Sequence, residues 1–188
     1  MRAVVLGRRN FREYDQVVSL YSRSHGKLEV LAKGAKKIVS KNAAHLEPSC
    51  VVDVGIVSGA EIDRLTSVQC VSHFSHMRDR ERTIRFAALV LHTIDRIIKP
   101  NEPDHRLFDL LEDWLVQLNR SEHTHPGVVD LFFLEVLVLL GFDPQPHIPA
   151  SVSDWSYKRL HDFTLRFMQT QLEIAIPDWA RGDMAVAL

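Results

Sequence analysis

The chain has 188 residues, of which 46% are hydrophobic and 25% are charged, and its formal net charge is −1. This composition is that of a folded protein of one or two domains and excludes a disordered chain. Two cysteines are too few for a disulfide-rich secreted scaffold. No apolar run reaches the roughly 20 residues of a membrane-spanning helix, and the N-terminal segment turns basic too early for a secretion signal. We therefore expect a cytoplasmic protein that does not interact with a membrane.

Charge is distributed unevenly along the chain. Residues 1–41 carry ten Lys or Arg against three acidic residues, whereas the remaining residues carry 13 against 21. The N-terminal part therefore has a balance of +7 and the rest a balance of −8. Such an asymmetry indicates that the basic part meets a polyanion.

Residues 1–76 have the β-branched composition, the turn residues and, in places, the period of two that are typical of short strands. We expect strands over residues 3–6, 17–21, 28–32, 51–57 and 62–71. Five such strands fit a small barrel of the OB type. A two-residue turn between the last two strands sets Cys50 opposite Gln69, whereas a three-residue turn sets it opposite Cys70. The pattern leaves both registers open, and in a reducing compartment we expect two buried thiols.

After about Met77, apolar residues recur with the period of helices. The expected helices cover about residues 84–98, 104–118, 126–141 and 154–174. The third of them is apolar nearly all round, as is typical of a helix at the centre of a domain. The sequence thus predicts an α+β protein, with a five-stranded OB-fold barrel domain over 1–76 and a helical bundle domain over 77–188.

Cations gather around the expected third strand and after the first strand. A phosphate backbone needs a row of cations, and neighbouring aromatic rings such as Phe11 and Tyr14 can stack on unpaired bases, whereas Tyr21 fits the core better. Surface lysines that are merely solvated are the alternative. We predict a nucleic-acid-binding surface that comprises Arg8, Arg9, Arg12, Tyr14, Lys27, Lys33, Lys36, Lys37 and Lys41.

The sequence carries no motif of an enzyme or of a metal site. A glycine-rich phosphate loop, a G-x-S-x-G elbow and an H-E-x-x-H helix are all missing. The histidine pairs 73/76 and 123/125 lack nearby cysteines at ligand spacing, so we expect structural or solvated roles for them. The expectation is a protein that is not an enzyme and needs no cofactor or metal.

Several motifs in this order resemble the RecO family of bacterial recombination mediator proteins. The matching pieces are an apolar strand running into basic residues at 4–9, residues 15–21, HGK at 25–27, AKGAKK at 32–37, LEP at 46–48 and LGF at 140–142. The resemblance covers about residues 1–143 and implies an N-terminal OB-fold, a helical C-terminal domain and no catalytic residue. Many relatives carry a four-cysteine zinc site after the LGF segment. Residues 143–188 contain no cysteine, so no zinc site is expected.

The resemblance also implies a function. It points to a nucleoid-associated protein that anneals complementary single strands and assists recombinase loading on coated single-stranded DNA during recombinational repair. The implied partners are single- and double-stranded DNA, RecR, and the C-terminal tail of single-strand DNA-binding protein. Arg106 and Arg120 flank the second expected helix; they either border a groove for that tail or are solvated helix ends. The other possible functions are an OB-fold protein-interaction adaptor without nucleic-acid affinity and an RNA-binding module.

Overall fold

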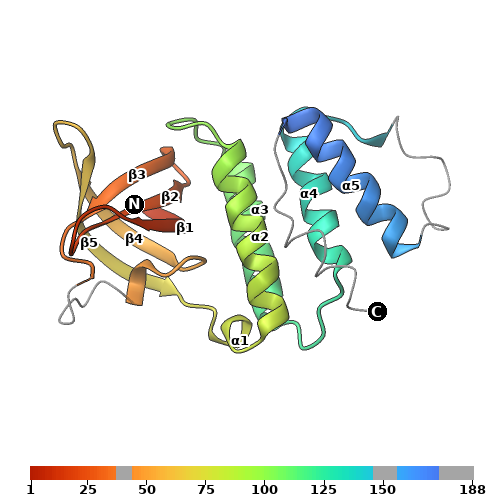
Figure 1. The fold of residues 1–188 in the computed structure, drawn as a ribbon, viewed down its shortest axis with the longest axis horizontal. Coiled ribbons are helices and arrows are strands. Elements are labelled where there is room, and N and C mark those ends of the chain that lie inside the picture. The colour runs from red at the N-terminus through yellow and green to blue at the C-terminus, as the bar shows by residue number, and fades with distance from the viewer. Residues whose placement is uncertain (37–43, 146–155, 174–188) are drawn as a thin grey trace. The chain divides into compact units, whose positions relative to one another are not determined.

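The computed structural model describes residues 1–36, 44–145 and 156–173, which form two compact units, 1–120 and 121–188. Each unit is described by itself (Figure 1). Among the described residues, the first unit contains five strands followed by three α-helices, and the second contains two α-helices. The strand and helix content confirms the predicted α+β class. The predicted division after residue 76 falls within the short helix α1 (Ser75–Arg78), shortly after the last strand ends at Ser72, and stays a prediction.

The strands close into a barrel. They are β1 (Arg2–Asn10), β2 (Gln16–Ser22), β3 (Gly26–Ala32), β4 (Val51–Val57) and β5 (Asp63–Ser72), in the order β1-β2-β3-β5-β4. β1 pairs antiparallel with β4, which closes the barrel, and β3 pairs parallel with β5. This is the five-stranded OB-fold that the sequence predicts. A short 3₁₀ helix, Ala44–Leu46, precedes β4.

The barrel interior is filled by alternate residues of the strands, as the strand period of two requires. Val5, Val18, Leu20 and Val30 are among the fully buried residues of this core. The residues between them, such as Ser19 and Tyr21, point to the outer face of β2, yet they are also buried. Since one face of a strand is normally solvated in a small antiparallel sheet, another element must cover the outer face.

Helices of the same unit cover the outer face of β2 and β3. They are α2 (Glu81–Ile97) and α3 (His105–Arg120), which follow the short helix α1 (Ser75–Arg78). The Tyr21 ring lies 6.1 Å from that of Phe108, and its hydroxyl donates to the backbone carbonyl of Asp104 at 3.0 Å. Gly26 has φ +70°, and a Cβ there would lie 2.5 Å from the backbone of Glu102. The α2–α3 connection is therefore packed tightly against the start of β3.

The register of β4 and β5 differs from both registers that the sequence left open. Val52 lies opposite Cys70, and the ladder continues to Val57 opposite Arg64, so the connection is longer than a two- or three-residue turn. The Cys50 thiol is buried and interacts with that of Cys70, and burial raises its pKa to about 11. Both cysteines are free thiols.

The second unit contains α4 (Gly127–Leu139) and α5 (Tyr157–Leu172). The two helices are joined by a buried contact in which His161 Nδ1 lies 2.9 Å from Asp130 Oδ1. Burial raises the pKa of Asp130, and its hydrogen bond with His161 acts in the opposite direction. The sequence predicts that this apolar helix lies at the centre of a domain, whereas α4 buries Phe132, Val136 and other residues on one side and leaves Leu131 and Val138 56% and 55% exposed.

Candidate nucleic-acid interface

One end of the barrel brings together cations from two connections that are distant in sequence. The backbone N–H of Lys36 donates to the carbonyl of Tyr14 at 3.0 Å, and the N–H of Gly34 donates to Asp15 Oδ1 at 2.8 Å. Gly34 has φ +64°, a conformation that favours glycine. These contacts fix residues 33–36, which follow β3, against residues 11–15, which join β1 to β2. We call these two segments the loop end of the barrel.

The loop end exposes the side chains that a nucleic acid would need. Arg12, Lys33 and Lys36 are exposed, and the Phe11 and Tyr14 rings are 45% and 48% exposed. The Arg12 guanidinium lies 5.1 Å from the centre of the Phe11 ring, within the range of a cation–π contact. Cations and aromatic faces side by side suit both the phosphates and the bases of an unpaired strand.

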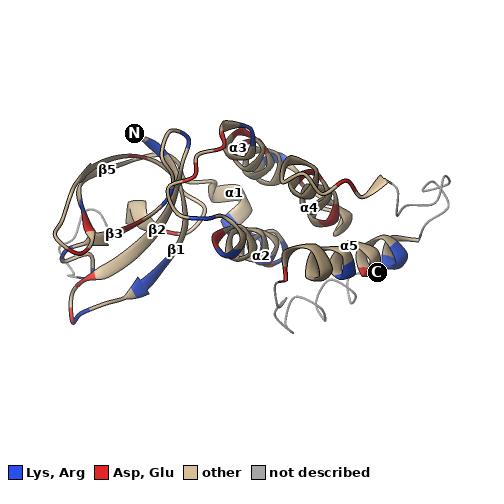
Figure 2. Ribbon diagram, turned by 90° about the horizontal axis from the view of Figure 1, so that it is seen from above, with Lys and Arg blue, Asp and Glu red and all other residues tan. Residues whose placement is uncertain are grey.

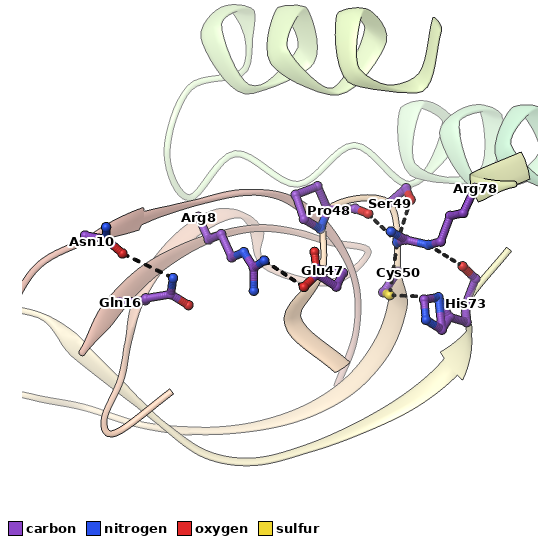
Figure 3. Close-up of polar contacts among 9 residues, drawn as sticks. All are labelled: Arg8, Asn10, Gln16, Glu47, Pro48, Ser49, Cys50, His73 and Arg78. Atoms are coloured by element: carbon purple, nitrogen blue, oxygen red, sulfur yellow. Dashed lines mark hydrogen bonds and ion pairs between the residues drawn. The ribbon is translucent and has the colours of Figure 1, made fainter. Parts of the chain in front are cut away.

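Arg8 and Arg9 lie at the end of β1, and each has a carboxylate partner. Arg8 Nη2 lies 2.6 Å from Glu47 Oε1 (Figure 3), and Arg9 Nη2 lies 3.3 Å from Glu29 Oε2. The two arginines pair with Val18 and Val17 of β2, so they point to opposite faces of the strand. Ion pairs with this much solvent exposure contribute little free energy, and a phosphate can replace either carboxylate at small cost.

Lys27 lies at the other end of β3. Its ammonium contacts Asp95 Oδ1 of α2 at 3.0 Å and also the Asp95 backbone carbonyl, and the side chain is only 16% exposed. Asp95 Oδ1 also accepts from the Ser19 hydroxyl at 2.5 Å. Lys33 lies six positions after Lys27, just beyond the end of β3, which is about 20 Å away at 3.3 Å per residue. The structure therefore places Lys27 between the barrel and α2 and does not bring it to the loop end.

The middle of the barrel's outer face is also closed to a ligand. OB-folds commonly bind oligonucleotides across strands 2 and 3 and the adjoining loops. Here Ser19, Tyr21 and Lys27 on that face contact α2, α3 and their connection. A strand of nucleic acid can reach the loops but not the centre of this face.

Sequence reasoning missed one cation that belongs to this region. Arg64 at the start of β5 is exposed and lies opposite Leu31, two residues before Lys33. Arg64 reaches this region only because β5 pairs in parallel with β3, and the sequence pattern does not predict that pairing. The predicted Lys37 and Lys41 lie outside the described residues. Figure 2 shows the distribution of cationic and acidic residues over the ribbon.

The LEP segment links the loop-end side of the barrel to the first helix. Leu46 is buried in the barrel core, and Glu47 holds Arg8. Arg78 of α1 donates to the Pro48 carbonyl at 2.5 Å, to the Ser49 hydroxyl at 2.9 Å and to the His73 carbonyl at 2.8 Å (Figure 3). At the strand ends, Gln16 Nε2 donates to Asn10 Oδ1 at 3.3 Å. The motif thus has a structural explanation.

Over residues 1–36, 44–145 and 156–173, no three side chains of the metal-ligating types are grouped so that they could hold an ion. No helix within these ranges has the length and apolar character needed to cross a bilayer.

Comparison with known proteins identifies the family. The family model for the Recombination protein O N-terminal region matches residues 1–74, and the model for the C-terminal region matches residues 78–147. DNA repair protein RecO of Nocardioides sp. is 30% identical over 145 residues, which cover 76% of this chain and 59% of the relative. The proteins of the same name from Geobacter metallireducens and Cutibacterium acnes are each 30% identical, over 74% and 76% of this chain and 57% and 61% of the relatives. The chain thus spans somewhat over half the length of these relatives. Both family models and the relatives agree with the motifs and the barrel, and the chain belongs to the RecO family of DNA repair proteins.

Proposed function

We propose that this protein binds DNA at the loop end of its barrel and anneals complementary single strands in recombinational repair. The observation that carries the proposal is the pair of hydrogen bonds from residues 34 and 36 to residues 14 and 15. These contacts bring the segment that carries Lys33 and Lys36 against the segment that carries Arg12 and two exposed aromatic rings, which supports the proposal. Membership of a family of DNA repair proteins supports DNA as the polyanion.

The chemistry of the loop end suits annealing. Cations that neutralise phosphates attract any sequence equally and release counterions, so the contacts are sequence-independent and weakened by salt. Such contacts let a bound strand shift until its complement is in register. They also reduce the electrostatic repulsion between two strands that approach each other. The mechanism is one of binding and needs no covalent step.

In the cell, we propose, this activity assists the loading of recombinase onto coated single-stranded DNA. RecR and the tail of single-strand DNA-binding protein are the proposed partners, and the nucleoid is the proposed location. Arg106 and Arg120 stay candidates for the tail contact. Arg106 Nε lies 3.6 Å from Asp104 Oδ1, and Arg120 is exposed at the end of α3. Titration with a synthetic tail peptide tests this contact, and the absence of a saturable signal would remove it.

The experiment that tests the function compares annealing of two complementary labelled oligonucleotides with and without the cognate single-strand DNA-binding protein. We expect this protein to accelerate annealing on both bare and coated strands. Acceleration on bare strands alone would indicate a general cationic binder. No affinity for either oligonucleotide would favour the protein-interaction adaptor, and a strong preference for RNA would favour the RNA-binding module.

A further inference from the structure

The solvent face of α2 carries a row of basic side chains, which lies outside the loop end. At 100° per residue, Arg82, Arg85, His92 and Arg96 fall within an arc of about 80°, and Lys99 follows the end of the helix. All five are exposed, whereas the other side of the helix buries Ala87, Val90 and Ile94 in the unit. Figure 2 marks the cationic residues on the α2 ribbon. We call these five residues the α2 row.

Among the described residues, most side chains of the α2 row form no ion pair. Arg85 pairs with Glu81 at 2.7 Å, in a pair whose glutamate is 78% exposed. In the part of the chain that the structure describes, the side chains of Arg82, Arg96 and Lys99 take part in no hydrogen bond or ion pair. The carboxylate of Asp95, which would otherwise reduce the positive charge of this helix, is bound by Lys27 and Ser19 of the barrel.

The helical part as a whole is acidic, and the row is therefore a local feature. The neighbouring helix α3 carries Asp109, Glu112 and Asp113. Arg23 of the barrel pairs with Asp109 at 2.8 Å. The barrel thus contacts a carboxylate on each of the two helices, and α2 keeps its cations on the exposed side. The overall charge balance of the C-terminal part conceals this separation.

The shape of the row fits a polymer backbone. Arg82 and Arg96 are 14 residues apart, which is about 21 Å along a helix at 1.5 Å per residue. A straight edge of this length that carries Arg82, Arg85 and Arg96 can follow several phosphates of one strand. An acidic peptide is the other polyanion that cations attract, but the large exposed apolar side chain that the structure describes on α2, Ile84, lies about 120° around the helix from the centre of the row.

We propose that the α2 row is a second binding site for the phosphate backbone of a nucleic-acid strand. The inference rests on the proposed function, because the loop end identifies nucleic acid as the ligand. Asp95 joins α2 to the start of β3, and the loop end follows the last residue of β3. The two surfaces therefore lie on one compact unit and are separate. A protein with two such sites can hold two strands at once, as annealing requires.

The test counts strands per protein. A fluorescent 12-nucleotide oligothymidylate is titrated against the full chain and three variants. Arg82→Ala/Arg96→Ala removes two charges from α2 and keeps good helix formers. Lys33→Ala/Lys36→Ala removes two from the loop end, and Lys158→Ala/Arg166→Ala removes two exposed cations from α5 as the matched control.

For the unaltered protein we expect two oligonucleotides per chain. The α2 variant should bind the first oligonucleotide with an affinity within about twofold of that of the unaltered protein, and the second at least about tenfold more weakly. At the second site, the slope of log affinity against log salt concentration should become smaller in magnitude by about 1.4. It should also slow annealing, whereas the α5 control should change neither property. If the α2 variant matches the unaltered protein in stoichiometry and slope, the inference is wrong, and the proposed function stands as long as the loop-end variant loses affinity.

Two other outcomes separate the remaining possibilities. If the unaltered protein binds no oligothymidylate, the proposed function itself fails. The remaining outcome is that oligoglutamate binds the unaltered protein but not the α2 variant, while the variant still binds two oligothymidylates. The α2 row is then a protein-docking face, and the proposal is overturned.

Discussion

Lys27 and Lys33 lie on or next to the same strand, six residues apart, and the structure gives them opposite roles. Lys27 is 16% exposed and contacts Asp95 of α2, whereas Lys33 is exposed at the loop end. In the sequence the two residues have the same charge and similar neighbours. The difference teaches that a cation's availability to a ligand depends on what packs over its strand.

The same contrast extends to the two regions that contain these lysines. The covered face of β2 and β3 holds its polar groups in specific contacts with helices, and it contributes to the stability of the unit. The loop end holds its cations on short backbone-bonded segments with few side-chain partners. We therefore expect substitutions on the covered face to change the free energy of unfolding, and substitutions at the loop end to change DNA affinity.

The largest expected effect comes from Asp95→Ala on the covered face. It leaves the ammonium of Lys27 largely buried without its carboxylate and removes the acceptor of the Ser19 hydroxyl. We expect the free energy of unfolding to fall by about 2–3 kcal/mol, as measured by urea denaturation, with DNA affinity of the folded protein unchanged. Asp113→Ala, at an exposed site on α3, is the control. A tenfold loss of affinity at unchanged stability would contradict the separation of roles.

At the loop end, Lys33→Ala/Lys36→Ala should act in the opposite way. We expect about a tenfold loss of affinity for single-stranded DNA. The slope of log affinity against log salt concentration should also become smaller in magnitude by about 1.4, because two phosphate contacts are lost. The loss should be similar for different base sequences, and thermal unfolding should be nearly unchanged. Binding is measured by fluorescence anisotropy at several salt concentrations. Lys158→Ala/Arg166→Ala is the matched control, and an equal loss in that variant would mean that only total charge matters.

Tyr21→Phe tests the covered face more finely. Burial raises the pKa of Tyr21 to about 12, above its ordinary value of about 10. The folded protein therefore keeps this proton while the unfolded chain loses it, so the contribution to stability is full below pH 10 and is lost as the pH rises toward 12. The variant should lose about 1 kcal/mol at pH 8, from the hydrogen bond to Asp104. Its free energy of unfolding should then fall less steeply between pH 10 and 12 than that of the unaltered protein in urea denaturation. An identical pH dependence in both proteins would show that Tyr21 is not the titrating group.

The sequence predicted much of the fold because each strand and helix carries its own local signal. The β-branched runs and the turn residues located all five strands, and the helical period located the four longer helices. The pairing of β5 with β3 and the long connection before Asp63 were not predictable, since they depend on contacts between distant segments. For the same reason the sequence grouped Lys27 with the loop-end cations and overlooked Arg64. The packing of α2 and α3 over β2 depends on tertiary contacts, and the sequence around Lys27 does not predict it.

The smallest expected effect lies where the two regions meet. Arg9 at the end of β1 is paired at 3.3 Å with Glu29 of β3, and both side chains are more than half exposed. Glu29→Gln removes the carboxylate that competes with a phosphate for Arg9. Because an exposed ion pair contributes at most about 1 kcal/mol, we expect DNA affinity to rise by only about two- to threefold, with stability nearly unchanged. Glu135→Gln on α4 makes the same change in net charge at an exposed site of the second unit and should leave affinity constant. Equal gains in both variants would indicate a general charge effect, whereas a loss of affinity in Glu29→Gln would show that the ion pair orients Arg9 for the phosphate instead of competing with it.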